Sequence, residues 1–476
     1  MVRAHAHHRA DAVAFAGTDS LSWAEYNARA DAIARLLMAK YPERGTRIAV
    51  QMADGPGVHL LYLAAERAGL IVVGIGPRAG AREVEHLVDR TGAAALLTDV
   101  PIVPEPGTDA GVVTPDRAFT ADELWFLNST SGTTGLPKIV MHQQARWFAF
   151  HELAVGSGAL TSDDVFMSVL PAPFGFGLWT AHFTPTILGS PCVLLDRFTP
   201  EAALAAIAAH RVTVLAAVST QFIMLLNAPE IHDADLSSLR VLYTGGEMVP
   251  YQRAAEFEDR TGARVLQFYG SNETGALSST TLTDDRETRL RTAGHVIESM
   301  QVRLLDPATA ADITETGGPG VAACRGAVNC LGYYNDDAAN AELFTAHGWM
   351  RTGDLCTIDA AGVLTVAGRT SDFIIRGGKN ISAAQVEAEV DTHPAVALCA
   401  AVAMPDPVFG ERVCIFLVAR DGHAAPDRAA VCAHLQTRGV GKELWPEHVV
   451  VVDGDLPRAS GGKVAKAELR ALAATL

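Results

Sequence analysis

Short apolar runs that favour β-strands alternate with helical patterns along most of this chain. The strand-like runs occupy residues 47–52, 212–218, 239–243 and 265–269, and the helical patterns occupy residues 24–40 and 201–210. Strands that are joined through helices run parallel, and a parallel sheet needs helices on its faces to bury its apolar residues. The sequence therefore predicts an α/β fold with layered, helix-covered sheets. Substrates of such folds usually bind at loops beyond the carboxyl ends of the strands.

The pattern changes after a polar break at residues 368–372. Beyond it, a capping box at Ser382 and Gln385 begins a helical pattern over residues 383–392, and apolar runs occupy 373–376, 413–418 and 449–452. A chain of 476 residues is also too long for one compact core. We therefore predict a large domain at residues 1–370 and a small α+β domain at residues 371–476.

Charge and apolar content exclude several classes of partner. The net charge of −16 argues against nucleic acid and anionic membranes, because both need a basic surface. The start of the chain has no apolar stretch of the signal-peptide type, and Glu66 and Arg67 interrupt the longest apolar region, so we expect no membrane span. The seven cysteines have no CxxC spacing, which disfavours a disulfide framework and a zinc site. We expect a cytoplasmic protein.

The strongest chemical signal is the segment Ser129-Thr130-Ser131-Gly132-Thr133-Thr134-Gly135-Leu136-Pro137-Lys138. It follows an apolar run, which places it on a loop that leaves a strand. Glycines let backbone N–H groups approach phosphate oxygens, hydroxyls add donors, and a lysine supplies positive charge. The segment is not a Walker A loop, because it lacks the G-K-[ST] ending. We interpret it as a phosphate-binding loop, with a flexible surface turn as the alternative.

Further segments combine glycine with charged or polar residues. They are Tyr269-Gly270-Ser271-Asn272-Glu273-Thr274, Arg351-Thr352-Gly353-Asp354-Leu355, Gly368-Arg369, Arg376-Gly377-Gly378-Lys379-Asn380 and Pro457-Arg458-Ala459-Ser460-Gly461-Gly462-Lys463. Each alone is also typical of a structural turn or an exposed loop. Together and in this order, they resemble the adenylate-forming superfamily of acyl- and aryl-CoA ligases, peptide-synthetase adenylation domains and beetle luciferases. The resemblance covers about residues 19–469 and is closest to acyl-CoA ligases.

The resemblance implies an enzyme that uses ATP, Mg²⁺ and a thiol acceptor, with a mobile C-terminal domain. The residues that would hold the β- and γ-phosphates are Thr130, Ser131, Gly132, Thr133, Thr134, Gly135 and Lys138. Tyr269 would stack on adenine, and Asp354 would accept hydrogen bonds from the ribose hydroxyls, with Arg369 close by. Glu273 would bind Mg²⁺, and Asn272, which stands where threonine is usual, would be a polar cofactor-binding residue beside it. Lys463 would bridge the substrate carboxylate and the α-phosphate, and Ser371 would be the hinge.

Two features of this sequence bear on the acid. Gly175 stands where peptide-synthetase adenylation domains carry an aspartate that pairs with the α-ammonium, and where activators of ortho-hydroxy aryl acids often carry asparagine. A buried ammonium without a counter-charge costs several kcal/mol, on the order of 3–5, so we expect no α-amino acid. Nearby residues predict a modest apolar pocket, with core packing as the alternative: Phe174, Phe176, Leu178, Trp179, Tyr243, Thr244, Gly245 and Gly246. The predicted substrate is an aromatic, alicyclic or medium-chain acid.

The acceptor is predicted from Gly377 and Gly378, which the resemblance places beside a tunnel for a phosphopantetheine arm. Glycines leave the wall of such a tunnel free of side chains. Coenzyme A is favoured because no carrier domain is fused here, with an acyl carrier protein or a non-thiol nucleophile as alternatives. A nucleotide-binding regulator is disfavoured because pure binding needs no bridging Lys463. A P-loop phosphohydrolase is disfavoured by the loop sequence.

Overall fold

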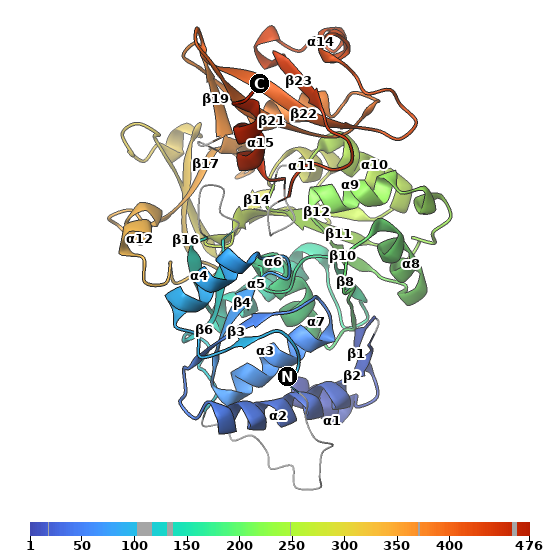
Figure 1. Cartoon of the computed structure of the whole chain (residues 1–476), viewed down its shortest axis with the longest axis vertical. Helices are drawn as coiled ribbons and strands as arrows, with labels where there is room; N and C mark the ends of the chain where they lie inside the picture. Colours follow the sequence, from blue (N-terminus) through green and yellow to red (C-terminus); the bar gives the residue numbers. More distant parts are fainter. Residues whose placement is uncertain (18, 102–116, 131–136, 248, 370–371, 459–463) are drawn as a thin grey trace.

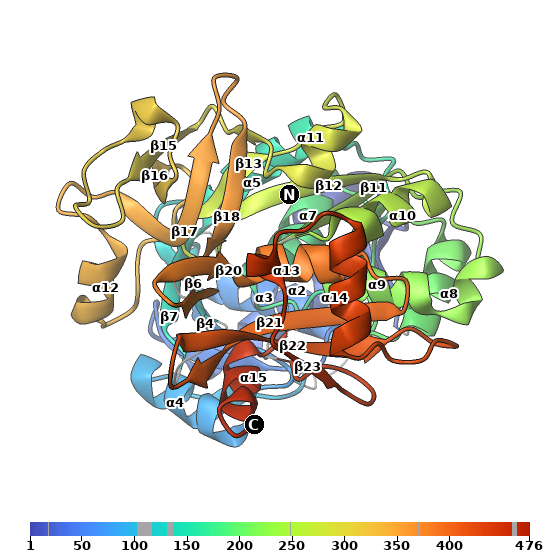
Figure 2. The same cartoon turned by 90° about the horizontal axis from the view of Figure 1, so that it is seen from above.

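The computed structural model describes residues 1–17, 19–101, 117–130, 137–247, 249–369, 372–458 and 464–476. Within these residues the chain forms four sheets. Three sheets come from residues before 370, and the fourth comes from residues after 371 and lies at one end of the molecule (Figures 1 and 2). The predicted boundary at residues 370 and 371 falls outside the described residues, so it stays a prediction.

The largest sheet has nine strands within the described residues. Their order is β14 (His295–Val296), β13 (Gly275–Ser279), β12 (Arg264–Ser271), β11 (Val241–Gly245), β10 (Val214–Ala216), β8 (Phe166–Ser168), β9 (Cys192–Val193), β1 (Val13–Ala16) and β2 (Leu21–Ser22). Pairing is parallel from β12 to β1 and antiparallel at both ends. One face packs on α8 (Pro200–His210), α9 (Ser219–Asn227) and α10 (Tyr251–Thr261). The other face packs on α5 (Gln144–Gly158) and the π-helix η2 (Leu178–Phe183), with α6 (Gly175–Gly177) and α7 (Thr184–Leu188) beside η2.

A second sheet orders β5 (Leu96–Leu97), β3 (Arg47–Gln51), β4 (Ile71–Ile75), β6 (Leu124–Ser129) and β7 (Ile139–Gln143). It is parallel except for β7. One face packs on α4 (Ala81–Thr91), and the other shares the large core with α1 (Val2–His8), α2 (Trp23–Lys40) and α3 (Pro56–Ala68). A capping box between Ser22 and Glu25 fixes the start of α2.

The third sheet is antiparallel throughout and packs its inner face on the same large core. Its strands are β15 (Met300–Leu305), β16 (Gly320–Gly326), β17 (Met350–Ile358) and β18 (Leu364–Arg369). α12 (Asp337–Leu343) contacts β17, and η4 (Thr314–Thr316) contacts β15. Two further short helices, α11 (Arg286–Arg291) and η3 (Pro229–His232), belong to the nine-stranded sheet: α11 contacts α10 and β12, and η3 contacts α8 and α9.

The C-terminal sheet orders β20 (Lys379–Ser382), β19 (Phe373–Arg376), β22 (Gly410–Ala419) and β21 (Val396–Asp406), with β23 (His448–Val451) paired to β22. Its helices are α13 (Ala383–Val390), α14 (Arg428–Thr437), η6 (Lys442–Leu444) and α15 (Lys466–Ala473). Successive side chains of a strand point to opposite faces. In β22, Val413 and Ile415 therefore pack with α13 and α14, whereas Cys414 and Phe416 pack with α15.

The predicted α/β class is confirmed, because helices cover the two large sheets, and a smaller sheet with its own helices and core follows residue 371. The expectation of parallel pairing holds from β12 to β1 in the first sheet and from β5 to β6 in the second. It fails for the whole third sheet. The strands of the third sheet have buried residues on one face and half-exposed residues on the other, which is typical of antiparallel sheets and does not resemble a parallel core strand.

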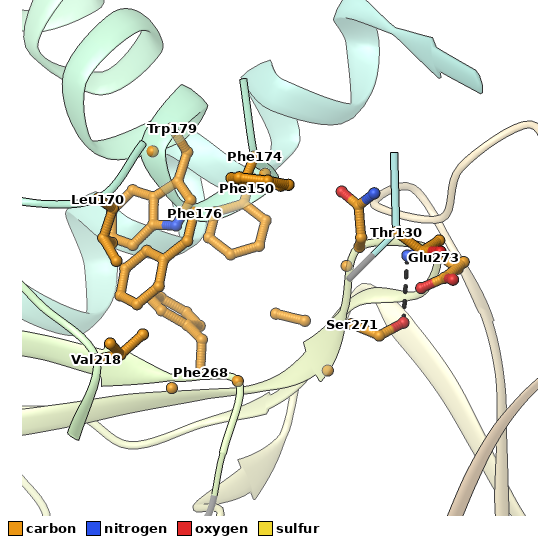
Figure 3. A pocket seen from close by; sticks show the side chains of 18 of the residues that line it. Thr130, Phe150, Leu170, Phe174, Phe176, Trp179, Val218, Phe268, Ser271 and Glu273 are labelled. Atoms are coloured by element: carbon orange, nitrogen blue, oxygen red, sulfur yellow. Dashed lines mark hydrogen bonds between the residues drawn. The ribbon is translucent and has the colours of Figure 1, made fainter. Parts of the chain in front are cut away.

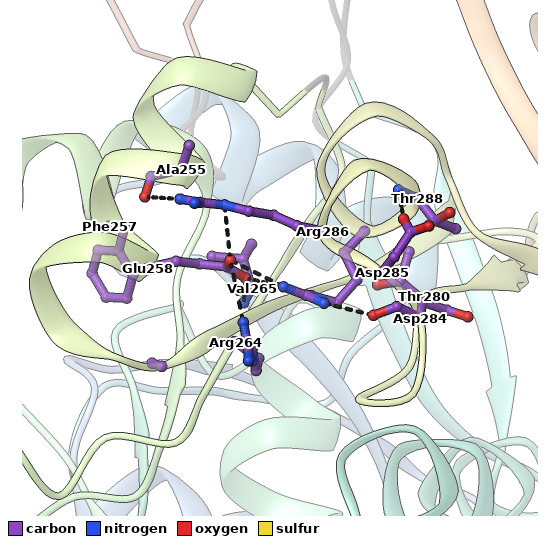
Figure 4. A network of polar contacts seen from close by, with 12 residues as sticks. Ala255, Phe257, Glu258, Arg264, Val265, Thr280, Asp284, Asp285, Arg286 and Thr288 are labelled. Carbon is purple, nitrogen blue, oxygen red and sulfur yellow. Dashed lines mark hydrogen bonds and ion pairs between the residues drawn. The ribbon is translucent and has the colours of Figure 1, made fainter.

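A buried ion pair fixes β12 between two helices (Figure 4). Glu258 on α10 and Arg289 on α11 are 6% and 3% exposed, and Arg289 Nη2 lies 2.9 and 3.0 Å from the two carboxylate oxygens. Glu258 Oε1 also accepts a hydrogen bond from the backbone N–H of Val265 at 2.9 Å. Because β12 leads directly into the segment 269–274, this network positions the strand that carries the predicted site.

We expect Glu258→Ala to lower the free energy of unfolding by about 3 kcal/mol, because it leaves the Arg289 guanidinium buried without its partner. The neighbouring Asp259→Ala is the matched control, since Asp259 is exposed and its ion pair with Arg286 contributes little. Urea denaturation followed by tryptophan fluorescence measures both variants. Equal destabilisation of the two variants would contradict this account of the network.

Candidate active site

A cavity of about 700 Å³ lies where the carboxyl ends of strands from the two large sheets meet. The loops after β6, β8 and β10 and the ends of β11 and β12 all contribute to its wall. The described residues that line it are Ser129, Thr130, Lys138, Arg146, Trp147, Phe150, Leu170, Pro171, Phe174, Gly175, Phe176, Gly177, Trp179, Val218, Thr244, Gly245, Gly246, Phe268, Gly270, Ser271, Asn272, Glu273, Gly275, Ala276, Tyr333 and Arg369. The cavity lies where ligands of α/β folds are expected.

One half of the cavity is an aromatic chamber, which we define by Phe150, Phe174, Phe176, Trp179 and Phe268 (Figure 3). The rings of Phe176 and Trp179 are stacked with centroids 5.6 Å apart, and Phe268 meets Trp179 edge-on, also at 5.6 Å. Phe150 lies 5.0 Å from Phe268. Such walls favour an apolar, flat or chain-like group over a charged one.

Most of the residues predicted for the acyl pocket lie in this wall: Phe174, Gly175, Phe176, Trp179, Thr244, Gly245 and Gly246. Leu178 and Tyr243 do not line the cavity. Both are fully buried, and Tyr243 donates a hydrogen bond to the carbonyl oxygen of Ala154 at 2.8 Å. For these two residues the core-packing alternative is correct.

The other half of the cavity is polar. Thr130 and Lys138 hold the two ends of the predicted phosphate loop together, since the Thr130 N–H donates to the Lys138 carbonyl oxygen at 3.0 Å. The Lys138 ammonium lies 3.8 Å from Glu342 and 4.9 Å from the ring centroid of Tyr333. The other loop residues of the prediction, Ser131, Gly132, Thr133, Thr134 and Gly135, lie outside the described residues.

Glu273 supplies the one carboxylate among the described lining residues. Its Oε1 accepts a hydrogen bond from the Tyr333 hydroxyl at 2.7 Å, and its backbone carbonyl accepts from the Cys330 N–H at 2.8 Å. Burial and the nearby Glu273 charge raise the pKa of the Tyr333 phenol above its ordinary value, so the hydroxyl keeps its proton and donates. Nothing in the sequence around Tyr333 indicated this contact, because it joins segments 60 residues apart.

Asp354 and Arg369 pair across β17 and β18, and Tyr269 comes to them from the end of β12. The Tyr269 hydroxyl donates to Asp354 Oδ2 at 2.9 Å, and Arg369 Nε lies 3.2 Å from Asp354 Oδ1. Burial raises the pKa of the Asp354 carboxyl, and the charge of Arg369 opposes this effect. The structure thus brings together three residues that the sequence suggested from separate motifs.

A chain of hydrogen bonds, here called the amide relay, connects Arg146, His142, Asn128 and Asn272. The buried Arg146 Nη1 contacts His142 Nδ1 at 2.6 Å, and His142 Nε2 contacts Asn128 Oδ1 at 2.7 Å. The side-chain amides of Asn128 and Asn272 contact each other twice, at 2.7 and 3.2 Å. Only Asn272 of these four was predicted as a site residue, because the others belong to no recognisable motif.

Gly377 and Gly378 form the turn between β19 and β20, away from the cavity wall. Their φ angles of 56° and 81° lie in the left-handed region that favours glycine. The Gly377 N–H donates to the Phe409 carbonyl oxygen at 2.8 Å. The remaining predicted residues of this domain, Lys463 and Ser371, lie outside the described residues.

All seven cysteines are buried and free. Three of them lie close to the site. The Cys330 N–H donates to the Glu273 carbonyl oxygen, Cys356 Sγ is 3.4 Å from the Tyr269 hydroxyl oxygen, and Cys324 Sγ contacts the side-chain amide of Asn329. Burial raises the pKa of Cys324 and Cys356 to about 12 and that of Cys330 to about 11. These thiols are therefore neutral and unreactive at physiological pH.

Within the described residues, no helix is long and apolar enough to cross a membrane.

The comparisons with known proteins cover nearly the whole chain. Residues 2–334 match the model of the AMP-binding enzyme family, and residues 385–463 match the AMP-binding enzyme C-terminal domain. The medium-chain fatty-acid–CoA ligase of Escherichia coli (strain K12) is 30% identical over 489 residues, which cover 95% of this chain and 85% of that protein. The feruloyl-CoA synthase of an Amycolatopsis species is 31% identical over 487 residues, with coverage of 98% and 97%.

A solved structure gives the same result for the fold. The crystal structure of ATP-bound MatB from Rhodopseudomonas palustris superposes with a TM-score of 0.83 at 27% identity, covering 97% of this chain and 96% of that chain. The resemblance drawn from the motifs is confirmed. The chain belongs to the AMP-binding enzyme family, whose adenylate-forming members include the CoA ligases that it matches.

Proposed function

We propose that this protein activates an apolar carboxylic acid with ATP as its acyl-adenylate and then transfers the acyl group to the thiol of coenzyme A. The observation that carries the proposal is the continuous cavity that joins the aromatic chamber to Thr130, Lys138 and Glu273. An apolar acid and a polyphosphate then meet at the boundary between the two halves. The CoA-ligase relatives support the same reaction class.

In this proposal Asp354, Tyr269 and Arg369 bind the nucleoside. Asp354 Oδ1 is buried and has no hydrogen-bond donor among the described residues, although it pairs with the Arg369 charge. A buried carboxylate oxygen without a donor is costly, and a ribose hydroxyl would satisfy it. The hydroxyl of Tyr269 holds the other carboxylate oxygen, which leaves its ring to stack on the base.

The residues at the polar end fit Mg²⁺. Magnesium in nucleotide sites is held by one or two carboxylates together with phosphate oxygens and water, and Glu273 presents one carboxylate oriented by Tyr333. Bound there, the ion would neutralise charge on the phosphates. Thr130 and Lys138, with the loop residues between them, would bind the β- and γ-phosphates.

The reaction then has two steps. A carboxylate oxygen of the acid attacks the α-phosphorus, the bond between the α- and β-phosphates breaks, and pyrophosphate leaves. Lys463 would neutralise the approach of the two anions in this step. In the second step the thiol sulfur loses its proton and attacks the acyl carbon, the acyl–phosphate C–O bond breaks, and AMP leaves.

The second step needs a different face of the C-terminal domain. Gly377 and Gly378 lie outside the cavity wall in the structure, whereas the thiol arm must reach the acyl carbon. We therefore propose that the C-terminal domain rotates about Ser371 between the steps. An acyl carrier protein or a non-thiol nucleophile is the alternative acceptor. Because ATP and CoA are both needed, we also propose a cytoplasmic location.

The test is pyrophosphate release from ATP across a panel of carboxylic acids, with and without coenzyme A. We expect release with aromatic, alicyclic or medium-chain acids, and conversion to a CoA thioester when CoA is present. Proteinogenic amino acids should give no release above background, because Gly175 offers no counter-charge to an α-ammonium. Release with an α-amino acid at comparable efficiency contradicts the pocket assignment. Adenylation without thioester formation would favour another acceptor.

A further inference from the structure

We propose that Asn272 recognises a neutral hydrogen-bonding substituent on the carbon next to the carboxyl-bearing carbon of the acid. The substrate class is then an aromatic acid with an ortho hydroxyl or ortho amino group. This inference rests on the proposed function and adds the feature by which the site selects its acid. Three observations carry it: the space beside Gly175, the fixed orientation of the amide, and the charge of Arg146.

The amide of Asn272 fills the space that a side chain at position 175 would take. A Cβ atom on Gly175 would lie 3.1 Å from Asn272 Oδ1 and 3.3 Å from the ring of Trp147. The absence of a polar side chain at Gly175 therefore does not make this wall apolar. A polar amide is present at the same place, and it comes from the loop after β12 rather than from α6.

The amide relay fixes which way the Asn272 side chain points. Arginine has donors and no acceptor, so Arg146 must donate to His142 Nδ1, and the neutral His142 then donates through Nε2. Burial and the Arg146 charge hold the pKa of His142 well below its ordinary value, which agrees with a neutral ring.

The contact of His142 must therefore be with the oxygen of Asn128, as observed at 2.7 Å. The amide nitrogen of Asn128 is then free to donate to the Pro173 carbonyl oxygen at 2.9 Å and to Asn272 Oδ1 at 3.2 Å. Asn272 completes the pair by donating Nδ2 to Asn128 Oδ1. Each contact of the relay then joins a donor to an acceptor, so the orientation of the Asn272 amide is determined.

Half of the hydrogen-bonding capacity of Asn272 remains for a ligand. A side-chain amide has two N–H donors and an oxygen with two lone pairs, and the contacts with Asn128 use one of each. A hydroxyl or an aromatic amine can both donate and accept, so it matches the remaining donor and lone pair. A methyl or a hydrogen at the same position leaves both unpaired.

The position of the Asn272 amide determines which substituent of the acid it can contact. Asn272 precedes Glu273 in the polar half, and it contacts the space at Gly175, between Phe174 and Phe176 of the aromatic chamber. When the carboxylate of the acid lies at the polar end and its ring lies in the aromatic chamber, the ring atom beside Asn272 is the one next to the carboxyl-bearing carbon. Substituents farther along the ring lie within the chamber.

The positive charge of Arg146 favours a neutral substituent on the acid over a positively charged one. Arg146 is 1% exposed, lines the cavity and forms no ion pair with a described residue. Its guanidinium raises the local potential, which disfavours an ammonium on the substrate. A neutral hydroxyl or aromatic amine avoids that repulsion.

The experiment compares wild-type protein on benzoate, 2-hydroxybenzoate, 2-aminobenzoate, 2-methylbenzoate and 4-hydroxybenzoate, measured as kcat/KM for pyrophosphate release. The 2-methyl compound matches the 2-hydroxy compound in size, and the 4-hydroxy compound places the same group elsewhere. We expect 2-hydroxybenzoate or 2-aminobenzoate to exceed 2-methylbenzoate and 4-hydroxybenzoate by about 10-fold to 100-fold, the range expected for one or two neutral hydrogen bonds.

Two variants assign the preference to the amide. In Asn272→Leu, which keeps the size but removes both hydrogen-bonding ends, the ratio of 2-hydroxybenzoate to 2-methylbenzoate should fall to about one. Gly175→Ala keeps Asn272 but moves its amide, and the same ratio should fall there too. A ratio unchanged from wild type in both variants overturns the assignment to Asn272.

The wild-type series decides the inference even if a variant fails to fold. Equal kcat/KM for 2-hydroxybenzoate, 2-aminobenzoate and 2-methylbenzoate overturns the inference but leaves the proposed function standing. Failure of every aromatic, alicyclic and medium-chain acid to release pyrophosphate contradicts the proposed function itself.

Discussion

Replacement of Lys463 by alanine is expected to slow adenylate formation by about 10³-fold or more, the effect of removing a cation that stabilises the transition state of phosphoryl transfer. Two anions approach each other in this step, and a mobile ammonium offsets their repulsion. Thioester formation from supplied acyl-adenylate should stay within about tenfold of wild type, because that step no longer joins carboxylate to phosphate. Single-turnover measurements of each half-reaction give the two rates separately.

The control is Lys442→Ala, which removes an exposed lysine of the same domain that lies near the Trp445 ring. Neither half-reaction should change in this variant. Loss of both half-reactions to the same extent in Lys463→Ala would mean that the lysine supports folding or domain position instead of the first chemical step.

Glu273→Ala is expected to slow adenylate formation by about 10³-fold, since it removes the carboxylate that would hold Mg²⁺ against the phosphates. Tyr333→Phe is the matched comparison. It keeps the carboxylate but removes the 2.7 Å hydrogen bond that orients it, so the rate should fall only about tenfold.

The magnesium dependence separates binding from orientation. The concentration of Mg²⁺ at half-maximal rate should rise strongly in Glu273→Asp and only slightly in Tyr333→Phe. Each variant is assayed at fixed ATP over a series of free Mg²⁺ concentrations. An unchanged Mg²⁺ dependence in Glu273→Asp would show that Glu273 does not contact the ion.

Local periodicity predicted many elements of this fold well. The helical pattern at residues 24–40 corresponds to α2 (Trp23–Lys40), and the apolar run at 373–376 is β19. α2 buries a stripe of apolar residues and begins at the Ser22 capping box, and Ser382 caps the start of α13 as predicted. Both signals act within a few residues of the chain. Pairing direction was harder, because it depends on which distant strand is the neighbour. The antiparallel third sheet shows this.

In the candidate site, too, local motifs were predictive, whereas contacts between distant segments were not. Motifs with glycine, hydroxyl and charged residues in a fixed order indicated Thr130, Glu273, Asp354 and Arg369, and those residues lie around one cavity or directly behind it. The sequence did not indicate that Asn272 fills the space beside Gly175. That contact joins residues nearly a hundred positions apart and depends on the approach of the Asn272 side chain to the backbone at Gly175. Only a three-dimensional structure shows it.

The burial of Cys324, Cys330 and Cys356 bears on how long one enzyme molecule can remain active. An acyl-adenylate is a mixed anhydride that acylates accessible thiolates, and these three cysteines lie behind the residues of the candidate site without lining the cavity. Thiols whose pKa is about 11 or 12 are thiolates in roughly 10⁻⁴ to 10⁻⁵ of molecules at neutral pH. The acyl-adenylate therefore meets almost no reactive thiolate of the protein itself. Self-acylation would then not limit the number of turnovers before inactivation, even when the acceptor thiol is scarce.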